Sequence, residues 1–382
     1  MDPETGHVRW AIDVPWSLGI SPVVVDDVVL TPSESDGLSA VDVRTGEPLW
    51  QLASVMPTLG SPGYQLVVTD RHVLAARGPE LLAVDPSSGS VSWAVDVGGE
   101  IHVATDGDVV VAVGDDTVAI DDVTGRELWR NDVVGLGSAT PVIDGDHLAV
   151  VVEEGSASEV NLVDGSTNWE VVPEPEHFFT MVGVTDDLVV IEDTFSAPNV
   201  DSHSDLRAID RTTAEDAWTA STEMTDQRLV AEGSVIDWSG GDLRVIDVNT
   251  GTERWSQPTR VSAAPALVGP DTIVTIEQAD YGLPVTVVQR DLRTGTAIWS
   301  VNIAGVPGGG RAALTSDVAF VGTARSDDSS AVERPDNGSV TAVDVTGSVR
   351  WTASVRDAVQ ATPLPLAQGL LVLGSDQVFG CD

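Results

Sequence analysis

Short apolar runs separated by tight polar turns follow one another along the whole chain, and no segment sustains a helical period. In one representative stretch, the apolar run 138–143 is followed by the turn Asp144-Gly145-Asp146 and then by a second apolar run at 147–152. Short runs rich in β-branched side chains predict strands. Asp-Gly pairs supply the positive φ angles that tight hairpins require. The pattern therefore predicts an all-β chain.

One motif, Asp-x-x-Thr-Gly-x-x-x-Trp, recurs nine times along the sequence. A clear copy holds Asp42, Thr45, Gly46 and Trp50, whereas the most divergent copies change the polar residues, replace Gly by Ala214 or lack one residue. Successive motif tryptophans lie 36 to 52 residues apart. A period of roughly 40–45 residues is typical of one four-stranded propeller blade. The motif tryptophans are Trp10, Trp50, Trp93, Trp129, Trp169, Trp218, Trp255, Trp299 and Trp351.

Each residue of the motif has a physical interpretation in a propeller. The Asp carboxylate is suited to accept hydrogen bonds from the backbone of the turn between the third and fourth strands, and Thr can do so more weakly. Gly permits left-handed backbone and lets a neighbouring chain approach closely. The Trp then lies on the outer strand, directed into the gap between adjacent blades. We therefore predict a structural, inter-blade role for all nine tryptophans.

The two ends of the chain carry complementary parts of one repeat. The first motif, at 2–10, has no strands before it, and the segment 352–382 has three apolar runs but no fourth. We expect the N-terminal strand to complete the last blade, which removes exposed sheet edges. The prediction is a single closed β-propeller domain over 1–382. Residues 1–14 form the closing outer strand, 15–351 eight whole repeats, and 352–382 strands A to C of the final blade.

The repeats, such as Ala40-Val41-Asp42-Val43-Arg44-Thr45-Gly46-Glu47-Pro48-Leu49-Trp50, resemble those of the quinoprotein-like (pyrroloquinoline-quinone-repeat) propeller family over essentially the whole chain. Members usually have eight blades, so the expected number is eight by this resemblance or nine by the motif count. The family's enzymes are quinone-dependent alcohol and glucose dehydrogenases with an adjacent Cys-Cys pair, a calcium ion and a catalytic Asp. This chain has one cysteine, Cys381, and cannot form that pair.

Charge and motif content narrow the possible chemistry further. The chain has 60 acidic residues and 19 basic ones, all Arg, for a net charge of −41, which disfavours nucleic-acid binding. A high-salt proteome and a GC-rich genome both explain this acidity. The histidines show no metal-like spacing, and Asp-rich stretches such as 106–108 and 327–336 fit hairpin and loop chemistry. We expect no catalytic, cofactor-binding or metal-binding residues, and neither the quinone nor calcium as a cofactor.

Strand direction alternates within a blade, so the connections separate onto two faces. The A–B and C–D turns share one face, here named the turn face, and the B–C and D–A connections share the other, the loop face. The longest connections are expected on the loop face: 195–205, 277–283 and 325–337 between B and C, and 173–177 and 306–311 between D and A. Insertions gathered on one face suggest a recognition surface, and neutral drift in loops is the alternative.

These observations predict a non-catalytic binding scaffold or sensor propeller of the cell envelope. It would recognise a protein, peptide or glycan through the loop face, as a monomer; the alternative is a divergent quinone- or calcium-dependent dehydrogenase. No apolar run approaches the roughly 20 residues of a membrane span. The N-terminus lacks a basic segment followed by an apolar one, the pattern of a secretion signal. We expect an extracellular or envelope location with a signal or anchor outside this chain, or else a cytoplasmic one.

Overall fold

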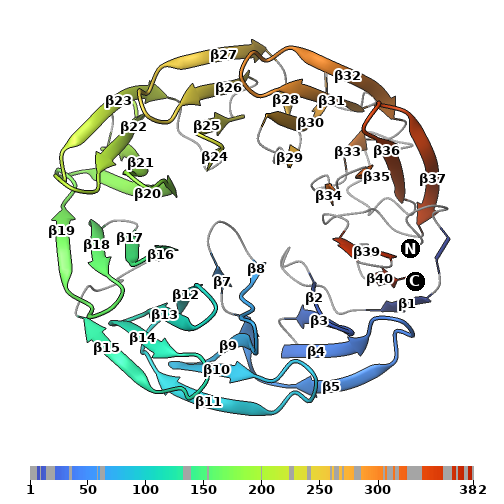
Figure 1. The fold of residues 1–382 in the computed structure, drawn as a ribbon, viewed down its shortest axis with the longest axis horizontal. Helices are drawn as coiled ribbons and strands as arrows, with labels where there is room; N and C mark the ends of the chain where they lie inside the picture. The colour runs from blue at the N-terminus through green and yellow to red at the C-terminus, as the bar shows by residue number, and fades with distance from the viewer. Residues whose placement is uncertain are drawn as a thin grey trace.

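The structure is a computed structural model that describes residues 7–8, 10–13, 22–33, 37–57, 59–60, 65–131, 139–152, 155–198, 200–222, 228–238, 242–258, 260–261, 266–268, 271–278, 285–303, 306–307, 313–314, 318–324, 338–355, 364–366, 369–373 and 377–380. Within these residues the regular structure is all β, and the strands form nine sheets arranged around a ring (Figure 1). The prediction of an all-β propeller is confirmed.

Eight sheets take their main strands from consecutive stretches of the chain, running from the ring axis outward, and they are numbered here as blades 1 to 8 (Figure 1). Blade 1 contains β2 (Val23–Val25), β3 (Val28–Ser33), β4 (Gly37–Asp42) and β5 (Pro48–Leu52), and blade 2 contains β6 (Met56–Pro57), β9 (Val73–Arg77), β10 (Glu80–Val84) and β11 (Val91–Asp96). Blade 3 contains β12 (His102–Thr105), β13 (Val109–Val113), β14 (Thr117–Asp121) and β15 (Glu127–Asn131), and its sheet is extended by β7 (Leu59–Gly60) and β8 (Gln65–Leu66). Blade 4 contains β16 (Ala139–Asp144), β17 (His147–Val152), β18 (Ala157–Asn161) and β19 (Thr167–Val171).

Blades 5 to 8 repeat the same order, and the ninth sheet combines both ends of the chain. Blade 5 contains β20 (His177–Val184), β21 (Leu188–Phe195), β22 (His203–Asp210) and β23 (Asp216–Thr222), and blade 6 contains β24 (Arg228–Ala231), β25 (Ser234–Asp237), β26 (Asp242–Asp247) and β27 (Glu253–Pro258). Blade 7 contains β28 (Arg260–Val261), β29 (Ala266–Val268), β30 (Thr272–Gln278), β31 (Val285–Asp291) and β32 (Ala297–Ile303), and blade 8 contains β33 (Val306–Pro307), β34 (Ala313–Leu314), β35 (Val318–Ala324), β36 (Gly338–Asp344) and β37 (Val349–Val355). The ninth sheet contains β38 (Leu364–Leu366), β39 (Gly369–Leu373), β40 (Gln377–Gly380) and β1 (Trp10–Asp13).

The first described strand lies beside the last one. β1 pairs antiparallel with β40 from Trp10↔Gly380 to Asp13↔Gln377, so the N-terminal strand takes the outer position of the ninth sheet. Figure 1 shows β1, in dark blue, next to β39 and β40, in red. Every described sheet therefore has its outer strand, although one of these strands comes from the opposite end of the sequence.

The hydrophobic core is divided among the gaps between blades, because each sheet is apolar on both faces. Between blades 2 and 3, for example, fully buried Leu74 and Leu81 pack in one cluster with Val103, Val110 and Val118. Burial of apolar area in each gap is the main source of stabilisation. A blade therefore depends on two neighbours for its core.

The motif folds as the sequence predicts. In the C–D turn of blade 7, the Asp291 carboxylate accepts hydrogen bonds from Thr294 N (2.8 Å) and Thr294 Oγ1 (2.9 Å), and Gly295 has a φ of +70°. The same two hydrogen bonds recur in the copies that begin at Asp42, Asp121, Asp210 and Asp247, whereas the copies at Asp85, Asn161 and Asp344 use other donors. The positive φ recurs in all described copies, including Ala214, whose φ is +60°. A register shift between strands C and D precedes the turn in each of these blades.

The hydrogen bonds to Asp291 lower the pKa of its carboxyl below the ordinary aspartate value, with Thr294 Oγ1 as the main cause. A lowered folded-state pKa gives stability that is present above the unfolded-state pKa and is lost as the pH falls through the folded-state value. We predict that Asp291→Asn is less stable than the wild type at pH 7, and that the difference shrinks below about pH 4. Urea unfolding across this range measures it; a constant difference would contradict the assignment. The pKa is lowered likewise for Asp42, Asp85, Asp121, Asp210, Asp247 and Asp344.

The motif tryptophans reach the following blade. Trp218 Nε1 donates to the carbonyl of Val248 at 2.8 Å, and a Cβ atom on Gly251 would lie 2.5 Å from the Trp218 ring. In seven described pairs, counting this one, the acceptor is the residue after the motif Asp or Asn of the next repeat. The other pairs are Trp10 with Val43, Trp50 with Pro86, Trp93 with Asp122, Trp129 with Leu162, Trp169 with Arg211, and Trp255 with Leu292.

Trp299 departs from this pattern. Its ring packs on Gly347 of blade 8, but its buried Nε1 atom has no hydrogen-bond partner within the described part of the chain. The turn it meets is the shortened motif that begins at Asp344, which lacks one residue. We infer that, because the turn is one residue shorter, it does not present to Trp299 the backbone carbonyl that accepts the indole hydrogen bond in the other repeats.

This difference gives a matched test of the inter-blade role. We predict that Trp218→Phe lowers the free energy of unfolding by about 1 kcal/mol more than Trp299→Phe, since a net hydrogen bond contributes roughly that amount. Both variants lose similar apolar volume, so the comparison isolates the indole hydrogen bond. Urea denaturation of the two variants measures it. Equal costs would mean that the Val248 hydrogen bond adds no stability.

Candidate functional site

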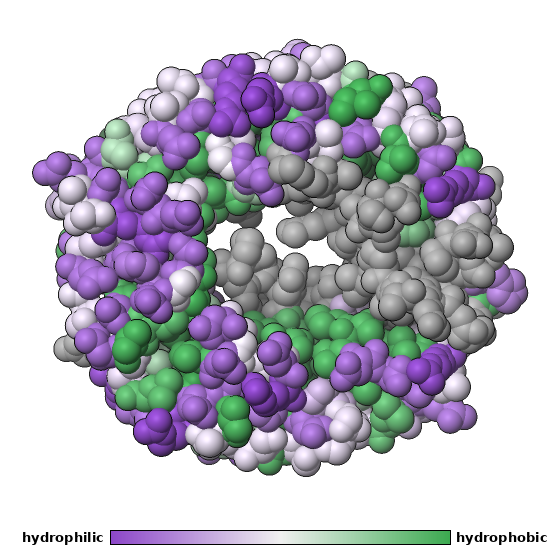
Figure 2. Space-filling view, viewed as in Figure 1, coloured by the Kyte–Doolittle hydropathy of each residue, from purple (hydrophilic) through white to green (hydrophobic). Residues whose placement is uncertain are grey.

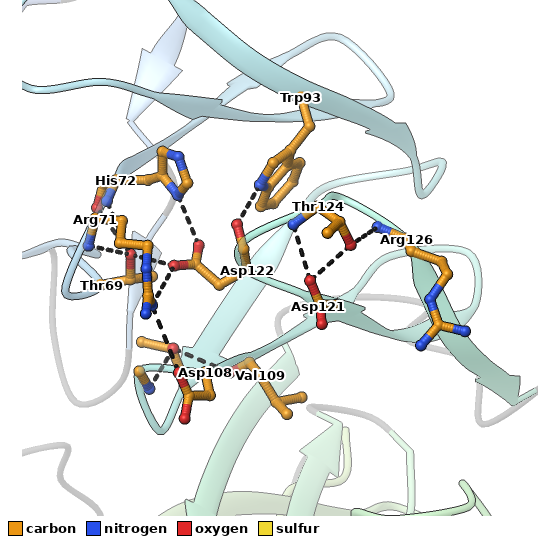
Figure 3. Close-up of polar contacts among 12 residues, drawn as sticks. Thr69, Arg71, His72, Trp93, Asp108, Val109, Asp121, Asp122, Thr124 and Arg126 are labelled. Atoms are coloured by element: carbon orange, nitrogen blue, oxygen red, sulfur yellow. Dashed lines mark hydrogen bonds and ion pairs between the residues drawn. The ribbon is translucent and has the colours of Figure 1, made fainter.

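A buried polar cluster lies between blades 2 and 3 (Figure 3). His72 Nδ1 lies 2.9 Å from Asp122 Oδ1, and Thr69 Oγ1 donates to Asp122 Oδ2 at 2.9 Å. The side chains of Asp122 and His72 are 0% and 9% exposed. A carboxylate, an imidazole and a hydroxyl are the groups of a nucleophilic triad, so this is the cluster most similar to a catalytic site among the described residues.

The connectivity of this cluster does not suit catalysis. In a triad the imidazole lies between the hydroxyl and the carboxylate, whereas here Asp122 lies between the other two groups. Thr69 Oγ1 also accepts from the backbone N–H groups of Arg71 (3.1 Å) and His72 (2.9 Å). Trp93 Nε1 donates to the carbonyl of Asp122, and its ring meets His72 edge-on at 6.1 Å. These contacts join two blades and hold a turn.

A second buried cluster lies between blades 4 and 5. Arg211 Nε contacts Glu159 Oε2 at 2.8 Å, and Arg211 Nη1 contacts Asp144 Oδ2 at 2.5 Å and the Thr185 carbonyl at 2.7 Å. His147 Nδ1 lies 2.7 Å from the other Glu159 oxygen. Arg211 and Asp122 occupy the same motif position, directly after the Asp. That position is apolar in most repeats, as at Leu162, Val248 and Leu292. The gap between blades 2 and 3 therefore differs from those repeats by a negative residue at this position, and the gap between blades 4 and 5 by a positive one.

Among the described residues, the remaining histidines are not grouped with other metal-binding side chains. His102 is 9% exposed, its Nε2 atom is buried with no hydrogen-bond partner among the described residues, and burial lowers its pKa against the opposing effect of Glu100. Across the residues that the structure describes, no three His, Cys, Asp or Glu side chains are grouped so as to hold a metal ion. In the same residues no helix is long and apolar enough to cross a membrane.

The loop face is best described at blade 5, and the structure corrects the strand limits there. The predicted loop 195–205 is shorter, because β21 continues to Phe195 and β22 begins at His203, and the predicted loop 173–177 ends earlier, because His177 belongs to β20. His203 falls within the predicted loop 195–205, but its cross-strand pairing with Phe195 keeps it in the sheet.

The other predicted long connections lie largely outside the described residues. Glu277 belongs to β30 and Val306 to β33, whereas 279–284, 308–312 and 325–337 are not described. The candidate recognition surface is therefore built here from blade 5 alone. It comprises the connections 173–176 and 196–202 and the strand ends that carry them.

Blade 5 carries an aromatic row at its loop-face end, named here the 177–195–203 row. His177 pairs with Phe195 and Phe195 with His203 across adjacent strands, with ring centroids 5.4 and 5.1 Å apart. Asp193 Oδ1 lies 2.7 Å from His177 Nδ1, and Arg207 Nη1 donates to Asp193 Oδ2 at 2.8 Å. The sequence alone did not reveal this row, since its neighbouring members are 18 and 8 residues apart in the chain; the hairpin register would have shown it.

Hydrophilic side chains surround this region. In Figure 2 they cover the left of the ring, where blades 4 and 5 lie, and an opening remains along the ring axis. Glu174, Glu176 and Asp201 are exposed. The turn 173–176 is held against the hairpin, because Ser196 N donates to the Glu176 carbonyl at 2.9 Å. Aromatic side chains set among carboxylates on a protruding hairpin can bind a partner.

Comparison with known proteins agrees with this architecture. A family model described as outer membrane protein assembly factor BamB matches residues 1–100, 80–234 and 284–380. The crystal structure of BamB from Moraxella catarrhalis is similar over 98% of both chains, with a TM-score of 0.52 and 14% identity. A quinohemoprotein alcohol dehydrogenase from Comamonas testosteroni is similar over 98% of this chain and 76% of its own, with a TM-score of 0.52 and 13% identity. No curated protein matches the sequence.

The structural similarities, at such low identity, establish the propeller fold alone. The family model covers most of the chain and includes the first and last described sheets. The expected resemblance to pyrroloquinoline-quinone-repeat propellers is confirmed. The chain belongs to the PQQ-like β-propeller family whose model is described as outer membrane protein assembly factor BamB.

Proposed function

We propose that the chain is a non-catalytic binding scaffold of the cell envelope that recognises a protein or peptide through its loop face. The observation that carries this proposal is the build of blade 5, which projects an aromatic row and two connections on that face. Loops held on a rigid scaffold are the usual place for recognition. The BamB description of the family supports an envelope location and a polypeptide ligand.

A quinone-dependent dehydrogenase is the alternative, since such enzymes share the fold. The residues present do not fit that chemistry. Cys381 is the only cysteine, so the adjacent pair expected beside the quinone cannot form. Calcium needs six to eight oxygen ligands, and the acidic side chains of the described residues form no such group. The carboxylates that are buried, such as Asp122 and Glu159, are already paired between blades.

We therefore predict that the quinone and Ca²⁺, added together, leave the melting temperature of the chain unchanged. A ligand that binds the folded state raises it by mass action, by about 2.7 kcal/mol at a hundredfold excess over Kd. Differential scanning fluorimetry measures the shift. A rise that needs both additions would favour the dehydrogenase.

The binding role is tested by trimming the loop face. Replacing 196–202 with Asn-Gly, which suits a two-residue hairpin, should remove the protrusion while keeping the blade. The matched control changes exposed valines of the turn face, Val123→Ser and Val163→Ser. Partners are captured from an envelope fraction of the source organism and compared. The trimmed chain should lose partners that the control retains, and retention by the trimmed chain would contradict the proposal.

A further inference from the structure

Blade 5 is taller than both of its neighbours on the loop face. Its second strand, β21, has 8 residues, against 6 in β17 and 4 in β25. All three strands begin at a turn-face hairpin, so the extra residues lie at the loop-face end. At about 3.3 Å per residue they add roughly 7 Å over blade 4 and 13 Å over blade 6. The 177–195–203 row is in this added part, beyond the blade 4 strand that packs beside it.

Side chains deeper in the same sheet hold the 177–195–203 row in place. Phe179, one row deeper on the same side of the sheet, is fully buried, and the Arg207 guanidinium lies 5.4 Å from the centre of its ring. Arg207 also binds Asp193 and Asp216, at 2.8 and 3.0 Å. Asp193 in turn holds His177. Arg207 is thus engaged by two carboxylates and does not offset the charge of the surface above it.

The surroundings of the row are acidic. Glu174, Glu176 and Asp201 lie in the two connections that flank it and are exposed. Glu176 has a positive φ of +69°, unusual for a residue with a side chain, and its carbonyl accepts from Ser196 N. The two connections that carry these exposed carboxylates are therefore fixed together, next to the strand end that carries the partly exposed ring of Phe195. Aromatic faces attract cations.

We propose that the 177–195–203 row is the binding site for an arginine side chain of a polypeptide partner. A guanidinium stacks on aromatic rings and pairs with carboxylates at once, and it is more weakly hydrated than an ammonium. The flanking carboxylates supply the complementary charge. This inference rests on the proposed function and adds to it the chemistry of the residue that the loop face recognises.

The test compares a labelled (Arg-Gly)4 peptide with (Cit-Gly)4, in which citrulline keeps the shape of arginine and removes its charge. Binding is followed by fluorescence anisotropy at about 0.1 M salt, where charge interactions are only partly screened. Phe195→Leu removes the aromatic face and should weaken binding of the arginine peptide about tenfold. Phe195→Tyr keeps the face and should bind as the wild type does. Val163→Ala, on the turn face, is the matched surface control.

The proposal is supported if the arginine peptide binds, the citrulline peptide does not, and only Phe195→Leu weakens binding among variants with unchanged melting temperature. It is overturned if both peptides bind equally, or if Phe195→Leu binds like the wild type. The trimmed hairpin separates this inference from the proposed function. If envelope partners are lost on trimming but are still bound by the Phe195→Leu variant, the scaffold role stands and the arginine-binding site is contradicted.

Discussion

Deleting residues 1–14 should lower the stability of the whole chain by at least about 4 kcal/mol. The deletion removes β1 from its pairing with β40, which leaves the ninth sheet without its outer strand. It also removes Trp10, which is 9% exposed and donates to the Val43 carbonyl of blade 1 at 3.0 Å. Loss of a buried Trp alone costs about 3–5 kcal/mol. The urea midpoint and the melting temperature measure the effect.

The control for this deletion is a synthetic peptide of residues 1–14 added to the shortened chain. If β1 closes the ring by pairing with β40, the peptide should bind and restore much of the lost stability. Trp10→Ala in the same peptide should weaken the rescue, because the indole no longer fills the gap above Gly46. A shortened chain that melts at the wild-type temperature would show that β1 contributes nothing to closure.

Arg211→Met should lower the free energy of unfolding by about 3–5 kcal/mol. The substitution leaves Glu159, whose side chain is 1% exposed, without its arginine partner between blades 4 and 5. Removing one member of a buried ion pair costs this much because the remaining charge stays buried without its permanent counter-charge. His147 still contacts Glu159 at 2.7 Å, but its imidazole is charged only when protonated. The loss also frees the carbonyl of Thr185, to which Arg211 donates. Urea denaturation at neutral pH measures the change.

Two further variants make the Arg211 prediction specific. Arg44→Met breaks an ion pair with Asp27 in which both side chains are 65% exposed, and exposed pairs contribute about 0–1 kcal/mol. The double variant Arg211→Met with Glu159→Gln should recover part of the loss, because the buried charge is removed with its partner. Equal costs for the Arg44 and Arg211 variants would contradict a buried, charge-specific link between these blades.

The repeat made most of the fold predictable. The spacing of tryptophans gave the blades, and the Asp-Thr-Gly pattern gave the turn, because both depend on local chemistry that recurs in every unit. Trp10 and the unfinished repeat at 352–382 also predicted that the two chain ends share a sheet. Residue pattern was less informative at blade ends: the polar residues around His203 resemble a loop, and only pairing with Phe195 places them in a strand.

The contacts between distant residues were not predictable in the same way. His72 and Asp122 are 50 residues apart and Arg211 and Glu159 are 52 apart. Nothing local identifies which two residues pair. A charged residue directly after the motif Asp, where other repeats carry an apolar one, was the available signal. The aromatic row of blade 5 depends on hairpin register, which a single sequence specifies weakly when the connection is long.

Site-directed photo-crosslinking tests the proposed recognition face most directly. A photoreactive phenylalanine analogue is placed at Val200 on the loop face, which is 56% exposed, or at Val163 on the turn face, which is 74% exposed. After irradiation with an envelope fraction, we expect discrete partner adducts from position 200 and none of the same mass from position 163. Adducts formed only from position 163, or equally from both, would contradict recognition through the loop face.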